Sequence, residues 1–260
     1  MKEPANKEGR KPGLRTMIKE PHFTPRKMLS MLDLKPDSLG PYALIPGPKE
    51  RSQMLRSRLR DPEKNFSFLD YEMYTGAIGD KRVTVGNGGR FAPDTAMTTE
   101  ILCAAGAEVL LRIGSCGSLQ DHVKVGDLVI VTGAIRGEGT TSYYVPKNFS
   151  TLADPAVVRA LEKAAKAAGV RYHLGRVFTT DALFQETPEL IQELSEQNVA
   201  AIDMVTSTFL TIAQLRQKKS GAILAVSDEC LCAKFGFRDP LFAAAEEKMV
   251  AVAEEALRYL

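Results

Sequence analysis

The stretch VLLRIGSCGSLQDHVKVGDLVIVT, residues 109–132, holds two apolar runs separated by a glycine-rich segment. The runs predict strands over 108–113 and 127–135. Arg112 ends the first run, and a turn is predicted at Gly114–Gly117. A cation at a strand end, followed by exposed backbone N–H groups, indicates an anion-binding turn. The simpler alternative is a tight turn between two strands.

Outside this stretch, apolar runs alternate with helical patterns from residue 42 onward. Strands are predicted over 42–46, 66–74, 81–86, 173–180, 199–204 and 221–227, and helices over 49–58, 93–105, 154–168, 188–197, 205–216 and 239–259. Asp154 and Asp239 each precede a proline, which suits a helix start. Several strands are apolar throughout, which is typical of a sheet covered on both faces. We therefore expect a single α/β domain without internal repeats.

The composition is that of an ordinary globular protein, with 260 residues, 44% hydrophobic and 25% charged. The net charge of +2 argues neither for nor against nucleic acid. Residues 1–27 hold eight Lys and Arg against three glutamates, so we expect a basic N-terminal segment over 1–30 and a domain over 31–260. The segment has no apolar signal region, and no apolar run approaches 18 residues. We expect a cytoplasmic protein without a membrane or nucleic-acid partner.

The cysteines and histidines do not form a metal-binding pattern. Only Cys230 and Cys232 are close together, and the three histidines are scattered. A C-x-C pair is neither a zinc knuckle nor a redox motif. We expect no metal, and reduced thiols fit a cytoplasmic protein best.

Polar or glycine-rich clusters follow four of the predicted strands. They are Gly47–Arg51, Gly86–Arg90, Arg112–Gly117 and Ser227–Asp228. In open α/β sheets, ligands bind beyond the carboxyl ends of the strands. Arginine offers a planar fork of donors, and serine offers a hydroxyl beside backbone N–H groups. The clusters therefore predict a site for an oxyanion such as phosphate.

Five segments carry a family resemblance, in order, over about residues 32–229: LKPDSLGPYALIPGPKER, GAEVLLRIGSCGSLQDHVKVGDLVIVTGAIR, FTTDALF, AIDMVTSTF and AVSD. With them the chain resembles the nucleoside phosphorylases, which include hexameric purine nucleoside phosphorylase, uridine phosphorylase and the methylthioadenosine nucleosidases. The resemblance implies a three-layer α/β/α fold around a mixed, partly barrel-like sheet. It also implies homodimers, often assembled into hexamers, with inorganic phosphate as co-substrate and no other cofactor.

The resemblance implies roles for several residues. Gly47, Arg51, Arg112 and Ser115 match the phosphate-binding positions, although a buried salt bridge is the alternative role for Arg112. Asp228 matches the catalytic acid of the purine-cleaving branch. A carboxylic acid near purine N7 can share a proton as the glycosidic bond breaks.

Other residues match the substrate pocket. Phe184 matches the aromatic side chain that lies against the base, with a plain core phenylalanine as the alternative. Met204, Cys116 and Gly117 are expected to line the pocket. The Gln/Arg pair with which uridine phosphorylases read uracil is absent, because Thr187 and Glu189 stand nearest to those positions. The resemblance therefore favours a purine base.

Three positions depart from the family pattern. Val205 stands where a glutamate accepts hydrogen bonds from the ribose hydroxyls, and the nearby Asp203 is predicted to point to the other face of its strand. Met31 replaces a histidine that reaches a neighbour's 5′-hydroxyl, and Phe68 replaces an arginine donated across the dimer. Arg90, in a loop near sugar and phosphate, is a candidate to compensate.

The function expected from the resemblance is phosphorolysis of a purine nucleoside or modified nucleoside, giving free base and sugar 1-phosphate. This is a pentosyltransferase reaction of purine salvage. Two alternatives stay open. One is a hydrolytic nucleosidase acting on a nucleoside, or on a nucleotide whose phosphate Arg90 binds. The other is a catalytically weakened family member that only binds its ligand.

Overall fold

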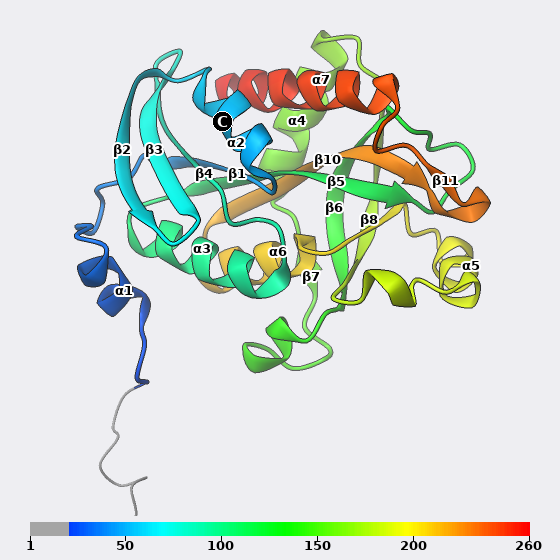
Figure 1. Cartoon of the computed structure of the whole chain (residues 1–260), viewed down its shortest axis with the longest axis horizontal. Coiled ribbons are helices and arrows are strands. Elements are labelled where there is room, and N and C mark those ends of the chain that lie inside the picture. Colours follow the sequence, from blue (N-terminus) through cyan, green and yellow to red (C-terminus); the bar gives the residue numbers. More distant parts are fainter. Residues whose placement is uncertain (1–20) are drawn as a thin grey trace, which may run out of the picture.

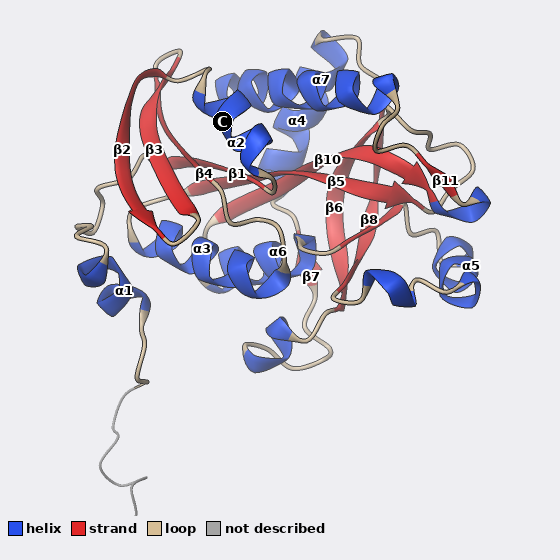
Figure 2. Ribbon diagram, in the orientation of Figure 1, coloured by secondary structure: helices blue, strands red, loops and turns tan. Residues whose placement is uncertain are grey.

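An eleven-stranded mixed sheet forms the centre of the protein in a computed structural model that describes residues 21–260 (Figures 1 and 2). The strands are β1 (Tyr42–Pro46), β2 (Arg60–Phe68), β3 (Tyr71–Ile78), β4 (Lys81–Gly86), β5 (Val109–Ser118), β6 (Leu128–Gly137), β7 (Thr151–Leu152), β8 (Tyr172–Thr180), β9 (Ala201–Asp203), β10 (Lys219–Glu229) and β11 (Lys234–Phe235). Because β5 pairs with both β9 and β10, the strands β10, β6, β8, β9 and β5 close into a small barrel. The predicted α/β class with a partly barrel-like sheet is confirmed.

Helices cover both faces of this sheet, as the apolar strands predicted. They are α1 (Pro25–Met31), α2 (Lys49–Arg56), α3 (Ala92–Ala104), α4 (Pro155–Ala167), α5 (Pro188–Glu196), α6 (Thr206–Leu215) and α7 (Pro240–Ala256). On one face α3 and α6 bury Leu102 and Phe209 in one apolar cluster. On the other, α4 and α7 bury Leu161 and Met249 in a second cluster (Figure 1). The layers are thus helix, sheet and helix.

Helices α4 and α7 begin at the two aspartates that the sequence marks as helix starts. The side chain of Asp154 accepts a hydrogen bond from the N–H of Ala156 at 2.8 Å, and Asp239 accepts one from Leu241 at 2.9 Å. Each aspartate satisfies a backbone donor that the first helical turn leaves without a partner. These caps fix where α4 and α7 begin.

Two predicted elements are wrong. The strand expected over 66–74 is a hairpin of β2 and β3, which turns at Leu69, where φ is 52°. The turn expected at Gly114–Gly117 is part of β5, because β10 pairs with β5 in parallel from Val109 to Ser118. Long-range pairing therefore extends the strand through glycines that suggested a turn.

The segment expected to be a basic extension overlaps a helix. Helix α1 begins at Pro25, and Leu29 on it is 2% exposed and packs in the same apolar cluster as α3. Residues 1–20 lie outside the described residues, so the expected division at residue 30 stays a prediction. Among residues 21–260, no helix combines the length and apolar character needed to cross a membrane.

Candidate active site

The middle of β5 lies at a gap in the sheet. On one edge, β1 pairs with β5 as far as Ile113, and β9 pairs with it only from Gly117. On the other edge, β10 runs alongside. Within the described part of the chain, positions 114–116 thus have a pairing strand on one edge only. Because ligands of α/β sheets bind where neighbouring strands diverge, Ser115 stands at a suitable place.

Two glycine-containing loops approach this gap closely. A Cβ atom on Gly47, after β1, would lie 3.1 Å from the carbonyl oxygen of Gly89, after β4. A Cβ atom on Gly89 would lie 3.0 Å from Nη1 of Arg112, which donates a hydrogen bond to the Gly89 carbonyl at 2.8 Å. The missing side chains let the loop of Gly89 reach Arg112 and let the loop of Gly47 pack against Gly89. The structure therefore brings Gly47, Arg112 and the loop before Arg90 together.

The guanidinium of Arg112 lies beside a buried carboxylate. Its Nη2 is 3.6 Å from Oδ2 of Asp203, and its Nε donates to Oγ1 of Thr206 at 3.4 Å. The prediction that Asp203 points away is wrong, because β9 ends at this residue and the chain turns there into α6. The salt bridge that the sequence left open as an alternative is thus present.

Asp203 is itself held in place by neighbouring hydroxyl and backbone groups. Its Oδ1 accepts a hydrogen bond from Oγ1 of Thr179 at 2.8 Å, and its Oδ2 accepts one from the N–H of Thr206 at 3.0 Å. Burial lowers the pKa of Arg112, and the charge of Asp203 opposes that shift. Asp203 therefore stabilises the charged guanidinium where the sheet opens.

Arg51 is a second buried arginine near Arg112. Its Nη1 donates to the carbonyl of Ile113 at 3.2 Å, and its Nε donates to Oε1 of Glu246 on α7 at 3.1 Å. Arg51 is 3% exposed, and its charge is one of the causes that lower the pKa of Arg112. Two buried cations within electrostatic reach of each other favour an anion between them.

The same strand leads from Arg112 to Asp228. The guanidinium of Arg112 folds over Gly114, where a Cβ atom would lie 2.8 Å from Nη2. Three residues further along β5, Gly117 pairs with Asp228 of β10. Three residues of strand span about 10 Å. Arg112 and Asp228 therefore lie against the backbone of the same strand, at positions about 10 Å apart along it.

The carboxylate of Asp228 occupies space that a side chain on Gly117 would take. A Cβ atom there would lie 2.5 Å from both Oδ2 of Asp228 and Sγ of Cys230. The thiol of Cys230 donates to Oδ2 at 3.7 Å. The hydroxyl oxygen of Ser227 is 2.5 Å from Oδ1 of Asp228 and 3.1 Å from the carbonyl of Cys116. Since a hydroxyl both donates and accepts, Ser227 fits either protonation state of Asp228.

Comparison with known proteins decides the family. The sequence profile of the Phosphorylase superfamily matches residues 41–258. The chain belongs to this superfamily. It is an enzyme of the nucleoside phosphorylase family, and the family binds nucleosides and phosphate.

Individual superfamily members differ in the base that their names record. A uridine phosphorylase of Thermococcus kodakarensis is 32% identical over 240 residues, covering 87% of this chain and 84% of that protein. A guanosine phosphorylase of Halorubrum lacusprofundi is 28% identical over 210 residues, covering 81% and 83%. The crystal structure of a uridine phosphorylase from Vibrio fischeri, complexed with 6-hydroxy-1-naphthoic acid, has a TM-score of 0.81 at 22% identity and covers 90% of this chain and 100% of that one.

The other residues expected in the substrate pocket of this phosphorylase differ in how exposed they are. Phe184, on the short helix η3 (Leu183–Gln185), is 95% exposed, so it is not a core phenylalanine. Met204 is half-buried, whereas Val205, at the N-terminus of α6, is 1% exposed. Cys116 is buried, and its thiol points to the carbonyl of Ala225 at 3.9 Å. The side chain of Val205 offers no hydrogen-bond acceptor at the position where the family pattern has a glutamate.

Three relevant charged residues were missed from the sequence. Glu246 pairs with Arg51 across 195 positions, which no local pattern reveals. Burial raises the pKa of Glu186 to about 7, and the charge of Asp228 adds to the shift. Lys49 lies two residues before Arg51, and only its place in the fold distinguishes it from other exposed lysines.

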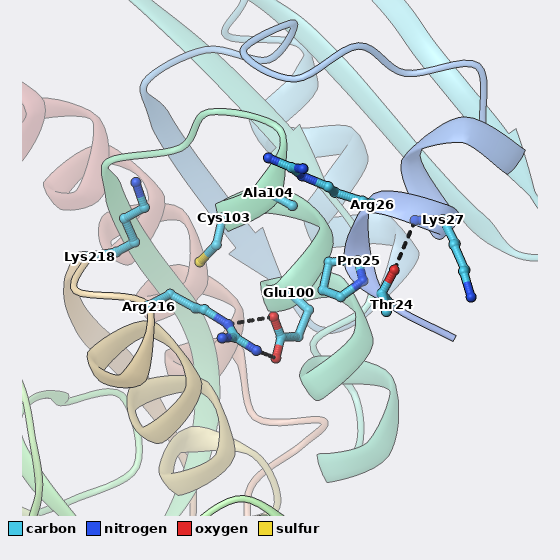
Figure 3. Close-up of a pocket in the computed structure, with 9 residues that line it drawn as sticks. All are labelled: Thr24, Pro25, Arg26, Lys27, Glu100, Cys103, Ala104, Arg216 and Lys218. Atoms are coloured by element: carbon cyan, nitrogen blue, oxygen red, sulfur yellow. Dashed lines mark hydrogen bonds and ion pairs between the residues drawn. The ribbon is translucent and has the colours of Figure 1, made fainter. Parts of the chain in front are cut away.

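Two of the cavities on the described surface are lined by several charged side chains. One of about 640 Å³ lies against α1, α3 and the end of α6, and Arg26, Arg216 and Lys218 contribute cations to it (Figure 3). Arg216 there binds Glu100 at 2.8 and 2.7 Å, and none of the predicted site residues lines this cavity. The other, of about 260 Å³, is lined by Gly47 and Arg90 among others. Within residues 21–260 no cluster of three His, Cys, Asp or Glu side chains could hold a metal ion.

Proposed function

We propose that the protein cleaves the N-glycosidic bond of a purine nucleoside, or of a modified purine nucleoside, with inorganic phosphate. The products are the free base and a sugar 1-phosphate. The observation that carries the proposal is the arrangement along β5, where the guanidinium of Arg112 lies against Gly114 and the carboxylate of Asp228 lies against Gly117, three residues further along the strand.

Phosphate binds, in this proposal, at the gap beside Ser115. The backbone of Gly47, the guanidinium groups of Arg51 and Arg112 and the hydroxyl of Ser115 supply the donors, with Arg90 at the edge. Arg51 and Arg112 already face carboxylates, so phosphate shares their donors with Glu246 and Asp203. Pre-positioned cations of this kind stabilise a charged nucleophile without further reorganisation.

Asp228 acts on the other reactant. One phosphate oxygen attacks C1′ of the sugar while the bond from C1′ to the base nitrogen breaks, and the electron pair of that bond leaves with the base. A proton from the carboxyl group of Asp228 goes to the base, so that the base leaves as a neutral molecule and not as an anion. Ser227 supports this role, because its hydroxyl can accept a hydrogen bond from the protonated carboxyl and donate one to the carbonyl of Cys116.

The proposal also specifies a purine base, although related enzymes are named for both uridine and guanosine. Asp228 supports a purine, because a purine nitrogen can receive its proton. Phe184 is free to lie against the base, at 95% exposure. The buried Val205 supports a sugar that lacks hydroxyl groups or carries apolar substituents, because its side chain accepts no hydrogen bond.

A substrate panel tests the proposal. Purified protein is incubated with purine and pyrimidine nucleosides, 5′-modified nucleosides and nucleoside 5′-monophosphates, with and without phosphate, and free base is measured. We expect purine release only when phosphate is present. Base release at the same rate without phosphate would favour the hydrolytic alternative, and cleavage of uridine alone would contradict the role of Asp228. Binding without cleavage of any substrate would favour the weakened, ligand-binding alternative.

We also propose a cytoplasmic role in purine salvage, carried out by a homo-oligomer. The four cysteines are free thiols, which fits a reducing compartment. Exposed apolar side chains near the β2–β3 hairpin and the start of α3, such as Leu69 and Phe91, support a subunit interface. Sedimentation of the purified protein at several concentrations tests the oligomer.

A further inference from the structure

The cavity of about 260 Å³ beside the phosphate site contains cations that the family resemblance does not assign. The residues that line this cavity include Gly47, Lys49, Asp70, Glu72, Asn87 and Arg90. Gly47 is shared with the proposed phosphate site, so the cavity adjoins that site. Lys49 is the first residue of α2, two positions after Gly47, and its side chain is exposed.

The four cations around Gly47 differ in how far their charge is already neutralised. Arg51 faces Glu246, and Arg112 faces Asp203, so each buried guanidinium has a carboxylate. Among the described residues, Arg90 forms one long ion pair, 3.9 Å from its Nε to Oδ2 of Asp94. Lys49 forms no ion pair within 4.0 Å among the described residues. A phosphate dianion needs positive charge that is not already paired at close range, and Lys49 and Arg90 provide it.

The acidic residues of the cavity do not cancel this charge equally. Glu72 is paired with Lys64 outside the cavity, at 2.7 Å, and that contact holds the pKa of Glu72 below its usual range. The charge of Lys49 lowers this pKa as well, so Glu72 also attracts Lys49, but without an ion pair within 4.0 Å. Asn87 is occupied by the backbone, donating to the carbonyl of Asp70 at 2.5 Å and accepting from the N–H of Glu72 at 2.8 Å. The side chain of Asp70 is the remaining acid, and it opposes an anion in the cavity.

We propose that Lys49, together with Arg90, binds the phosphate co-substrate from this cavity. The inference rests on the proposed function. It deepens that function by naming a source of positive charge within the same chain. In the family pattern an arginine donated across the dimer supplies positive charge, and Phe68 stands at the position of that arginine here. Lys49 contacts the outer oxygens of phosphate, and the donors at the β5 gap contact the inner ones.

Calorimetry with inorganic phosphate and the full-length protein tests the inference. Lys49→Met should weaken phosphate binding by about tenfold or more, because a charged hydrogen bond is lost, and Lys49→Arg should restore most of it. Asp70→Asn should strengthen binding, because it removes the opposing charge. Lys147→Met, at an exposed lysine in the loop after β6, is the matched control and should bind as the wild type does.

Cleavage kinetics give a second readout. The KM for phosphate should rise in Lys49→Met while the rate at saturating phosphate changes little, since Lys49 does not touch the base or the glycosidic bond. Unchanged phosphate affinity in Lys49→Met, or weaker affinity in Asp70→Asn, would overturn the inference and leave the proposed function standing. A wild-type protein that binds no phosphate at all would overturn the proposed function, and this inference with it.

Discussion

Arg112 and Asp203 form an ion pair inside the protein, with Nη2 3.6 Å from Oδ2 and side chains that are 5% and 0% exposed. The pair stands where β1 and β9 leave one edge of β5 open. An anion that enters this gap competes with Asp203 for the guanidinium. Arg112 therefore has a structural role beside the binding role that we propose for it, and the two can be separated by mutation.

Arg112→Met should weaken phosphate binding by about tenfold or more, since a charged donor is lost. It should also lower the free energy of unfolding by about 3–5 kcal/mol, because Asp203 is left buried without its counter-ion. Calorimetry with phosphate and chemical denaturation measure the two effects.

Asp203→Asn is the matched variant for Arg112→Met. It also breaks the buried pair and should also destabilise the fold, but it leaves Arg112 free to bind an anion. Its phosphate affinity should equal or exceed that of the wild type. Equal losses of phosphate affinity in the two variants would mean that Arg112 acts only through the fold.

Asp228→Asn should lower the rate of purine nucleoside cleavage by about 10²–10⁴-fold, because the amide keeps the shape but has no acidic proton to transfer. Steady-state kinetics with the best substrate of the panel measure this. Cys230→Ala, which removes only the thiol that donates to Oδ2, is the control and should retain most of the rate. Full activity in Asp228→Asn would show that the base leaves without this proton.

Gly117→Ala should lower the cleavage rate by about 10²-fold, a typical effect of displacing a catalytic group by about 1 Å. The added methyl group would lie 2.5 Å from Oδ2 of Asp228 and must push the carboxylate aside. Gly139→Ala is the control, because its nearest neighbour would be Oδ2 of Asp181 at 3.6 Å. Normal activity in Gly117→Ala would contradict the position given to Asp228.

The buried Val205 predicts weak discrimination between ribose and 2′-deoxyribose. A pocket that does not bond a hydroxyl group rejects or prefers it only slightly, so kcat/KM for inosine and 2′-deoxyinosine should agree within about tenfold. A strong preference for inosine would mean that another group, such as Asp203 or Arg90, binds the ribose hydroxyls.

Glu186 predicts a pH-dependent contribution to stability. Its pKa rises from 4.5 in the unfolded chain to about 7 in the fold, because burial disfavours the charge. The stability gained from protonation is complete below pH 4.5 and is lost as the pH rises through 7. Glu186→Gln should therefore reduce the fall in Tm between pH 5 and 8. Glu193→Gln, at an exposed position of α5, should not. The same slope in Glu186→Gln and wild type would refute this.

Helices α2 to α7 were predictable from sequence because their signals are local, whereas α1 was not predicted. Asp154 and Asp239 cap α4 and α7, and the helices begin within one residue of the expected positions. The strand after Arg112 was not predictable in the same way. Pairing of β5 with β10, more than 100 positions later, overrides the turn that its glycines suggest.

In the candidate site, too, some residues could be predicted from the sequence and others could not. The sequence singled out Gly47, Arg112 and Asp228 as candidates, because glycines and charges at strand ends are visible in it. The direction of Asp203 was mispredicted, since β9 is only three residues long and alternation does not extend beyond it. Glu246 could not be found at all, because only the packing of α7 brings it to Arg51.

The most direct test of phosphorolysis is the product balance of one reaction. A purine nucleoside that the protein cleaves is incubated with phosphate, and free base and sugar 1-phosphate are measured together, the latter by phosphorus NMR. We predict equal amounts of the two products and no base release when phosphate is omitted. Release of base with free sugar, independent of phosphate, would contradict it.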